Sequence, residues 1–334
     1  MAAAPSMAQS GASPETPRFH ADVKLVQVLA TVNDSRGAPI GGLEREDFTM
    51  LAAGTPQQIA VFERQTDRPL SVVLLFDASP SVAKEWKFEQ EAALRFVRSL
   101  LGPGAHPRDR IAVYKFSDYV QEMQGFTSSP SRLEKALSSI KSHGGTSVYD
   151  AIYLAAQVLE NRQGRRVIVA ITDGGDTTSS LNFSNGLEAA QRADAVVYSV
   201  IVVPITSDAG RNLGGENALK TISAATGGAA FRQHSSEHLD NAFRQIEKEL
   251  RTQYLIAFYP RGIPAGTGHF HKIELQVYRP AVRVRARSGY YVSSTAEPPS
   301  GATQTVSLPG GPPREPKKAP GKSLPAKTQA GKKP

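Results

Sequence analysis

Polar side chains follow two apolar stretches of the chain, at the point where each stretch ends. The stretch "LLFDASPSV" (74–82) places the carboxylate of Asp77 directly behind an apolar run and the hydroxyls of Ser79 and Ser81 at alternate positions after it. The stretch "ITDGGDT" places Asp173 behind a second apolar run in the same way. Carboxylate and hydroxyl oxygens are ligands that hard divalent cations prefer.

A third loop adds another hydroxyl, because "SHGGTSVYDAI" carries Thr146 immediately before an expected helix. The three loops together offer two carboxylates and three hydroxyls. An oxygen-only set of this kind suits Mg²⁺ first, with Mn²⁺ or Ca²⁺ as alternatives. Since Mg²⁺ usually retains waters, an incomplete protein shell leaves positions for an external group.

Strands and helices alternate around these loops, which predicts an α/β domain with a mostly parallel central sheet. "LSVVLLF" (70–76) is a continuous apolar run, as expected of a parallel strand that is buried on both faces. Ligands of open α/β sheets collect outside the carboxyl ends of the strands, where all three loops would lie. The other expected strands are 110–117, 165–172 and 195–203, and the expected helices are 84–101, 131–140, 147–161, 185–193, 216–226 and 237–253.

Helical spacing within 84–101 predicts which side chains face the core. Phe88, Ala92, Phe96 and Leu100 recur on one stripe of this helix. We therefore expect these four residues to pack against the sheet.

Alternating β patterns flank the α/β region on both sides. We expect the C-terminal strands either to form a sheet of their own or to join the N-terminal ones. The expected organisation is a disordered N-terminus (1–18), a small β unit (19–67), the α/β domain (68–250), a C-terminal β segment (251–293) and a disordered, basic tail rich in Pro, Gly and Lys (294–334).

Three arginines, Arg283, Arg285 and Arg287, share one face of an expected strand by the two-residue period. They form either an anion-binding stripe or a solvated, charged edge that resists aggregation, and the second interpretation is the more common one.

The loops resemble the metal-ion-dependent adhesion site of von Willebrand factor type A domains. That family has Asp-x-Ser-x-Ser on a first loop, Thr on a second and Asp on a third. All five positions are filled in order, by Asp77, Ser79, Ser81, Thr146 and Asp173. The resemblance spans about residues 68–250 and implies a Rossmann-like fold.

The resemblance also implies a role for each residue. Ser79 and Ser81 would bind the metal directly, and Asp77 would hold those serines and waters. Asp173 would act directly or through water, and Thr146 would join when ligand is bound. Such domains grip proteins by letting a partner's Glu or Asp complete the metal shell.

The flanks are similar to those of a bacterial subgroup, common in Acidobacteria, of von Willebrand factor A-related proteins. The similar stretches are "VQVLATVNDSRGAPIGGLEREDFTMLAAGTPQQI" and "YLIAFYP…HKIELQVYRPAVRVRARSGYY". This resemblance implies an exported protein without enzymatic activity.

Each polar residue also has a simpler interpretation. Asp77 and Ser79 alone could cap a helix, and Thr146 could serve a local turn. Asp150 and Asp176 are expected to support their loops. His234 and His238 have the spacing of a metal pair, but an exposed pair is the more common outcome without a third ligand.

Other functional classes fit less well. A haloacid dehalogenase-like phosphatase needs a second acid two residues after its nucleophile, where this chain has Ser79. A dinucleotide-binding protein needs a Gly-rich turn after the first strand, where this chain has "DASPS". A structural α/β module with an idle metal site remains an alternative.

The amino-acid composition excludes further functional classes. The formal net charge is +8, but residues 297–334 hold seven basic and two acidic residues, which leaves +3 for the rest of the chain. A nearly neutral body does not favour nucleic-acid binding, so we expect a protein partner that offers an acidic residue. The absence of cysteine excludes disulfides, thiolate catalysis and Cys-ligated zinc.

The first residues bear on localisation. "MAAAPSMAQSGASPETPRF" lacks the charged and apolar regions of a signal peptide, yet the small residues around "SMAQ" resemble the trailing end of one. We therefore expect export to the periplasm or the exterior, with an incomplete signal peptide in this sequence and the cytoplasm as the alternative. No apolar run approaches the roughly 20 residues that span a bilayer.

Overall fold

In a computed structural model of the chain, Met1–Ser294 form the first unit, which is separate from the residues that follow it. Everything below concerns the first unit. The residues that the structure describes are 25–64, 68–80, 86–203, 212–233, 235–263 and 268–291.

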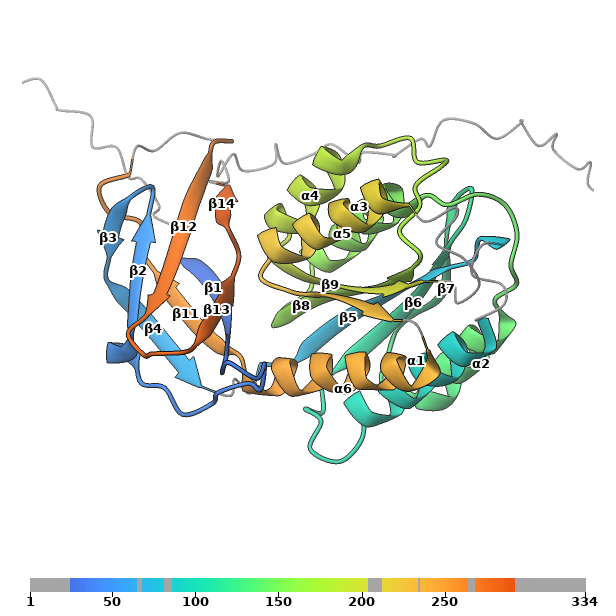
Figure 1. The fold of residues 1–334 in the computed structure, drawn as a ribbon, viewed down its shortest axis with the longest axis horizontal. Helices are drawn as coiled ribbons and strands as arrows, with labels where there is room; N and C mark the ends of the chain where they lie inside the picture. Colours follow the sequence, from blue (N-terminus) through green and yellow to red (C-terminus); the bar gives the residue numbers. More distant parts are fainter. Residues whose placement is uncertain are drawn as a thin grey trace, which may run out of the picture. The chain divides into compact units, whose positions relative to one another are not determined.

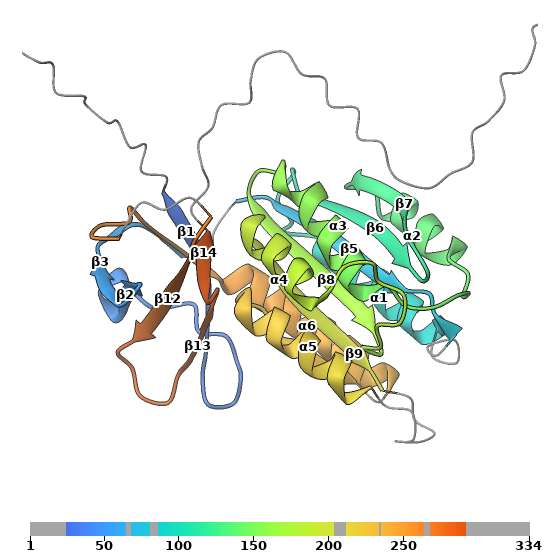
Figure 2. The ribbon, with the colours of Figure 1, turned by 90° about the horizontal axis from the view of Figure 1, so that it is seen from above.

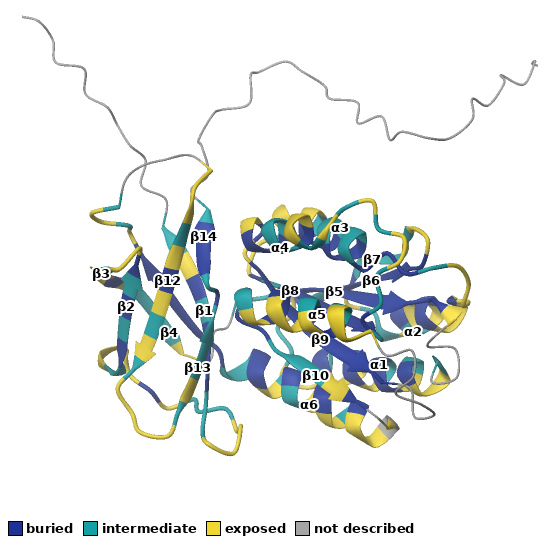
Figure 3. Cartoon of the chain, turned by 45° about the horizontal axis from the view of Figure 1, so that its top comes forward, coloured by how far each residue is buried: buried dark blue, intermediate teal, exposed yellow. Residues whose placement is uncertain are grey.

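A six-stranded sheet forms the centre of the α/β layer, in the order β10-β9-β8-β5-β6-β7 (Figure 1). All neighbouring pairs are parallel except β6 and β7. The strands are β5 (Leu70–Asp77), β6 (Arg110–Phe116), β7 (Val120–Thr127), β8 (Arg165–Thr172), β9 (Ala195–Val202) and β10 (Ala230–Gln233). The central strands β5, β8 and β9 are buried along nearly their whole length (Figure 3), which explains their unbroken apolar runs.

Two strands of this sheet were not predicted from the sequence. β7 is an edge strand with the sequence "VQEMQGFT", and its partly exposed polar residues hide the strand pattern. β10 is only four residues long, too short for a periodic signal.

Helices cover both faces of the sheet (Figures 1 and 2). One apolar core lies between the sheet and α1, α2 and α6, and a second lies between the sheet and α3, α4 and α5. The helices are α1 (Trp86–Leu100), α2 (Pro130–Ser139), α3 (Val148–Glu160), α4 (Phe183–Arg192), α5 (Leu213–Ala225) and α6 (Ser236–Thr252). The predicted α/β class is confirmed.

The predicted apolar stripe of α1 was wrong at its first position. Ala92, Phe96 and Leu100 are buried, but Phe88 is 53% exposed. Trp86 packs edge-on against Phe76 at the start of the helix, with ring centroids 5.0 Å apart, and so covers this part of the sheet in place of Phe88.

The flanking β segments join to form two four-stranded antiparallel sheets, ordered β13-β1-β11-β4 and β14-β12-β2-β3. Side chains from both sheets share one apolar core, so the sheets form a sandwich. Of the two arrangements left open by the sequence, the C-terminal strands adopt the one in which they join the N-terminal strands. The strands are β1 (Val26–Asn33), β2 (Phe48–Ala52), β3 (Thr55–Gln57), β4 (Ile59–Arg64), β11 (Tyr254–Phe258), β12 (Phe270–Val277), β13 (Arg283–Ala286) and β14 (Gly289–Tyr291).

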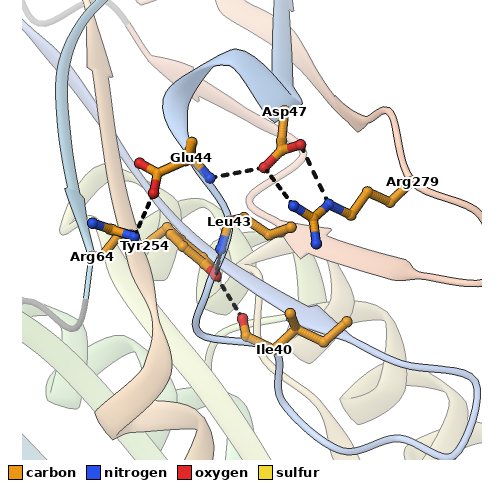
Figure 4. A network of polar contacts seen from close by, with 7 residues as sticks. All are labelled: Ile40, Leu43, Glu44, Asp47, Arg64, Tyr254 and Arg279. Atoms are coloured by element: carbon orange, nitrogen blue, oxygen red, sulfur yellow. Dashed lines mark hydrogen bonds and ion pairs between the residues drawn. The ribbon is translucent and has the colours of Figure 1, made fainter.

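A buried tyrosine fixes the connection between β1 and β2, which contains a short 3-10 helix, η1 (Arg45–Asp47) (Figure 4). The Tyr254 hydroxyl accepts a hydrogen bond from the Leu43 N–H (3.0 Å) and donates one to the Ile40 carbonyl (2.7 Å). This C-terminal tyrosine therefore satisfies backbone groups of the N-terminal segment that would otherwise be buried without partners.

Two arginines of the stripe, Arg285 and Arg287, connect the sandwich to the α/β layer, a role that neither interpretation drawn from the sequence included, whereas Arg283 is exposed. Arg285 pairs with the buried Glu249 of α6 at 2.5 Å. Arg287 is buried, pairs with Asp194 and donates to the Gln191 carbonyl. The sequence pattern could not reveal this role because the acidic and carbonyl partners lie far away in the chain.

Candidate metal centre

Two carboxylates lie at the carboxyl ends of neighbouring strands. β5 and β8 are parallel, with Phe76 opposite Ile171, so Asp77 at the end of β5 and Asp173 just after β8 share one edge of the sheet. Asp77 is fully buried, whereas Asp173 is partly exposed. The edge predicted to collect ligands therefore carries both acids.

Both oxygens of Asp77 accept hydrogen bonds. One oxygen accepts from the Ser79 N–H (2.9 Å), and the other accepts from the Thr172 hydroxyl (2.6 Å). Burial raises the pKa of Asp77 to about 6; the nearby charge of Asp173 acts in the same direction, and the hydrogen bonds from Thr172 and Ser79 oppose it. Asp77 is thus held in one orientation at a place where its negative charge lacks compensation.

Backbone hydrogen bonds hold the three predicted loops together. The His143 N–H donates to the Ala78 carbonyl (2.8 Å), which joins the second loop to the first. The Thr146 N–H donates to the Thr177 hydroxyl (2.9 Å), and the Thr177 N–H donates back to the Thr146 carbonyl (2.8 Å), which joins the second loop to the third. Thr146 is buried as a result.

The third loop depends on glycine. Gly174 has φ +89°, in the left-handed region that favours glycine. A Cβ on Gly215, near the start of α5, would lie 1.5 Å from the Gly174 carbonyl oxygen. The N-terminal turn of α5 therefore packs directly on the loop that carries Asp173.

Four of the five predicted residues, namely Asp77, Ser79, Thr146 and Asp173, lie on these connected loops. Ser81 lies outside the described residues.

Sequence reasoning missed two residues that shape this edge. Thr172 holds the second oxygen of Asp77, and its only signal was its position directly before Asp173. Asp118, after β6, accepts a hydrogen bond from the Gly145 N–H (2.6 Å). No pattern pointed to Asp118, because its partner comes from another loop.

The other polar residues weighed in the sequence have local roles. Asp176 accepts from the Val148 N–H (3.0 Å), and Asp150 accepts from the N–H groups of Ser180 and Leu181, so both support loops as expected. His234 lies outside the described residues. The His238 N–H donates to the hydroxyl of the helix cap Ser235.

The donor set fits a hard divalent cation. Within the described ranges, no basic side chain lies within 4.0 Å of Asp77 or Asp173. No group of three or more His, Cys, Asp or Glu side chains there is placed to hold a metal ion, so a cation at this edge would need the hydroxyls as further ligands. Two buried hydroxyls beside these loops, those of Ser117 and Ser147, have no hydrogen-bond partner among the described residues. Oxygen donors without a balancing positive charge are chemically suited to Mg²⁺ or a similar ion.

Comparison with known proteins places this region in a family. Residues 72–175 match the family described as the von Willebrand factor type A domain. No curated protein matches the chain significantly. Among the described helices, none is both long and apolar enough to cross a membrane.

Several solved structures similar to the chain are bacterial proteins. They include a von Willebrand factor type A protein from Catenulispora acidiphila (10% identity, TM-score 0.47, covering 83% of this chain and 76% of that one). BatB from Bacteroides thetaiotaomicron has 20% identity and a TM-score of 0.43, over 55% of this chain and 100% of that one. The PilB minor pilin from Streptococcus sanguinis has 13% identity and a TM-score of 0.43, over 56% of this chain and 62% of that one, which is less than two thirds of the pilin's length.

At these identities and TM-scores, the similar structures carry no argument about function. The family match covers β5, β6, β8 and the three loops that carry the candidate residues. Residues 72–175, which carry these strands and loops, are therefore similar to the von Willebrand factor type A domain.

Proposed function

We propose that this protein is a non-enzymatic binding module that holds an acidic side chain of a protein partner through a divalent cation. Mg²⁺ is the first candidate, with Mn²⁺ and Ca²⁺ as alternatives. Ser79, Ser81 and Thr146 would supply hydroxyl ligands, and Asp77 and Asp173 would supply negative charge.

One observation carries this proposal. Asp77 and Asp173 meet at one edge of the sheet, and no basic side chain of the described residues lies within ion-pair distance of either. A buried carboxylate without a countercharge is costly, and a bound cation removes that cost. The arrangement therefore supports a cation site better than a set of helix caps.

Some residues of the site orient its loops, and others would bind the cation. Asp77, engaged by Ser79 and Thr172, orients the first loop. When bound, the cation supplies an electrophilic position at which an external carboxylate can bind. Because hydroxyl ligands are neutral, much of the cation's charge stays available for that carboxylate.

The same geometry disfavours the phosphatase alternative. A nucleophilic carboxylate must reach the substrate, but Asp77 is 0% exposed and both of its oxygens accept hydrogen bonds. Mg²⁺-dependent hydrolysis of a generic phosphate ester that disappears in Asp77→Asn would overturn the binding-module proposal.

The metal site is tested by calorimetry with Mg²⁺. The double variant Ser79→Ala/Ser81→Ala should lose Mg²⁺ binding while keeping its circular dichroism spectrum, because two hydroxyl ligands are removed and no apolar side chain of the core is changed. The control Ser99→Ala/Ser131→Ala changes two helix serines and should bind as the wild type does. Unchanged Mg²⁺ affinity in the first variant would refute the site.

The partner is tested by pull-down from an envelope extract, with and without EDTA, followed by mass spectrometry. If the partner binds through the metal, one and the same protein should disappear from the captured material when EDTA is added and when the Ser79→Ala/Ser81→Ala variant is used as bait. Capture that is insensitive to both would favour the alternative of an idle metal site, with the β-sandwich making the contact.

Two finer assignments belong to the same proposal. We place the chain in the Acidobacteria-type subgroup, supported by the flanking segments that form one sandwich. We also propose that the protein acts outside the cytoplasm, in the periplasm or the exterior. Fractionation of cells that express the tagged native gene, with the protein found only in the cytosol, would contradict the second assignment.

A further inference from the structure

A cavity of about 750 Å³ lies at the end of the sheet opposite to the candidate metal centre. Its walls include the sandwich residue Gln27, the amino-terminal ends of β8 and β9 at Arg165 and Ala195, and the end of α3 at Glu160. The volume is in the range of pockets that hold small-molecule ligands.

Arginine dominates the charge of this cavity. Its lining contains two acidic side chains, Glu160 and Asp194, and six arginines: Arg68, Arg108, Arg165, Arg166, Arg192 and Arg287. The surplus of four positive charges exceeds the +3 of the whole chain outside its basic tail. A concave, low-dielectric wall that gathers one sign of charge focuses its field on a ligand of the opposite sign.

Carboxylates offset only part of this charge. Arg287 pairs with Asp194, Arg192 pairs with Glu188 at 2.7 Å, and Arg68 pairs with Glu63 at 3.4 Å. With Glu63 and Glu188 counted, four acidic side chains face the six arginines, so the surplus falls from four positive charges to two. The arginines outside these three pairs include Arg108 and Arg166.

Two of these remaining arginines carry the argument. Within the described part of the chain, no carboxylate lies within 4.0 Å of Arg108 or Arg166. Arg166 donates to the carbonyls of Arg162 (2.8 Å) and Ala193 (2.7 Å). Carbonyl oxygens accept the hydrogen bonds of Arg166 but do not cancel its full positive charge. Arg108 is exposed, and its side chain makes no hydrogen bond to a described residue.

Buried cations make this a formed site rather than a patch of surface arginines. Arg165 and Arg287 are each only 8% exposed. Hydrogen bonds fix both guanidinium groups, from Arg165 to the Arg68 carbonyl (3.1 Å) and from Arg287 to the Gly289 carbonyl (2.6 Å). A guanidinium that is already oriented loses little entropy when it binds phosphate or carboxylate oxygens.

We propose that this cavity binds a small anion with at least two negative charges, of the organic phosphate or polycarboxylate class. Guanidinium groups bind both phosphate and carboxylate through paired N–H donors. The site is separate from the metal centre, because it lies at the amino ends of the strands whose carboxyl ends carry Asp77 and Asp173.

The test uses the full chain freed of divalent cations on a chelating resin, in a buffer without EDTA or other polyanions, so that an anion cannot be held through a divalent cation at the other end of the sheet. Pyrophosphate and citrate are titrated separately by calorimetry, which distinguishes a phosphate ligand from a carboxylate ligand. We expect at least one of them to bind with a dissociation constant of about 1 mM or tighter.

Matched variants show whether binding occurs in the cavity. Arg108→Gln/Arg192→Gln removes two exposed cavity arginines and should weaken binding by about tenfold or more, since each lost guanidinium removes charge-assisted hydrogen bonds. Arg132→Gln/Arg244→Gln removes two exposed arginines outside the cavity and should bind as the wild type does.

Three results would overturn the proposal. They are no binding of either anion in the millimolar range, equal loss in both double variants, and unchanged binding in Arg108→Gln/Arg192→Gln. Circular dichroism of each variant ensures that a loss of binding reports the site rather than unfolding.

Discussion

The burial of Asp77 should make the stability of the protein depend on pH. It is fully buried, accepts hydrogen bonds from Ser79 and Thr172, and lies beside Asp173. Burial raises its pKa from 3.8 to about 6, so ionising it in the folded, metal-free protein costs free energy. A cation bound beside Asp77 would favour its ionised form and so lower its pKa.

This shift predicts a pH dependence of stability in EDTA. A raised folded-state pKa contributes stability that is present below the unfolded pKa and is lost as the pH rises through about 6. Between about pH 4.5 and about pH 7, the wild type should lose about 2 kcal/mol of unfolding free energy relative to Asp77→Asn. Urea unfolding of both proteins at the two pH values measures the difference, and identical pH profiles would contradict it.

Adding Mg²⁺ at about pH 7 completes the comparison. Saturating Mg²⁺ should stabilise the wild type, because a ligand that binds only the folded state shifts the unfolding equilibrium. Asp77→Asn should gain much less. Equal gains would show that the ion acts elsewhere on the protein.

At the scale of elements, the site depends on how closely α5 approaches the loop after β8. Gly215 leaves no room for a side chain, since its Cβ would lie 1.5 Å from the Gly174 carbonyl oxygen. Gly214, its neighbour in the same helix, has only one ordinary contact, at 3.5 Å from Asn212 Oδ1. The two glycines therefore form a natural pair for testing the contact.

Gly215→Ala should lower the free energy of unfolding by about 2 kcal/mol, because the helix or the Asp173 loop must move. It should also weaken Mg²⁺ binding. Gly214→Ala should leave stability unchanged or raise it by up to about 1 kcal/mol, since alanine favours a helix. Urea unfolding and calorimetry give both quantities, and equal behaviour of the two variants would refute the close contact.

At the scale of the whole first unit, arginines join the sandwich to the α/β layer. Arg287 is buried and bonds to Asp194, Gln191 and Gly289, whereas Arg283 on the same strand face is exposed. The stripe therefore contains two residues that join the layers, Arg285 and Arg287, and one that does not, Arg283.

Arg287→Gln should lower the free energy of unfolding by about 2 kcal/mol, because buried carbonyl acceptors lose a charged donor while the partly exposed Asp194 is resolvated. Arg283→Gln should change it by less than about 0.5 kcal/mol. Chemical unfolding followed by tryptophan fluorescence compares them. Equal effects would show that the stripe is a solvated edge.

The sequence predicted those parts of the structure that depend on local pattern. The buried strands read as unbroken apolar runs, and Asp77 and Asp173 stand at their ends, so both the fold class and the edge that bears the acids could be predicted. Features made by distant partners could not. Arg287 meets Asp194, and Asp118 meets Gly145, through chain topology that no local pattern encodes.

The pairing of β4 with β11 has a consequence for how the protein is made. The chain leaves the sandwich after Arg64 and returns at Tyr254, and these two residues face each other in the same antiparallel ladder. During synthesis on the ribosome, β1 and β4 therefore cannot pair with β11, the strand between them, until the whole α/β layer has emerged. The α/β layer is in effect an insertion between two paired strands of the sandwich, β4 and β11. A turn of about two to five residues could therefore replace it and leave a sandwich whose N-terminal and C-terminal strands are synthesised one directly after the other.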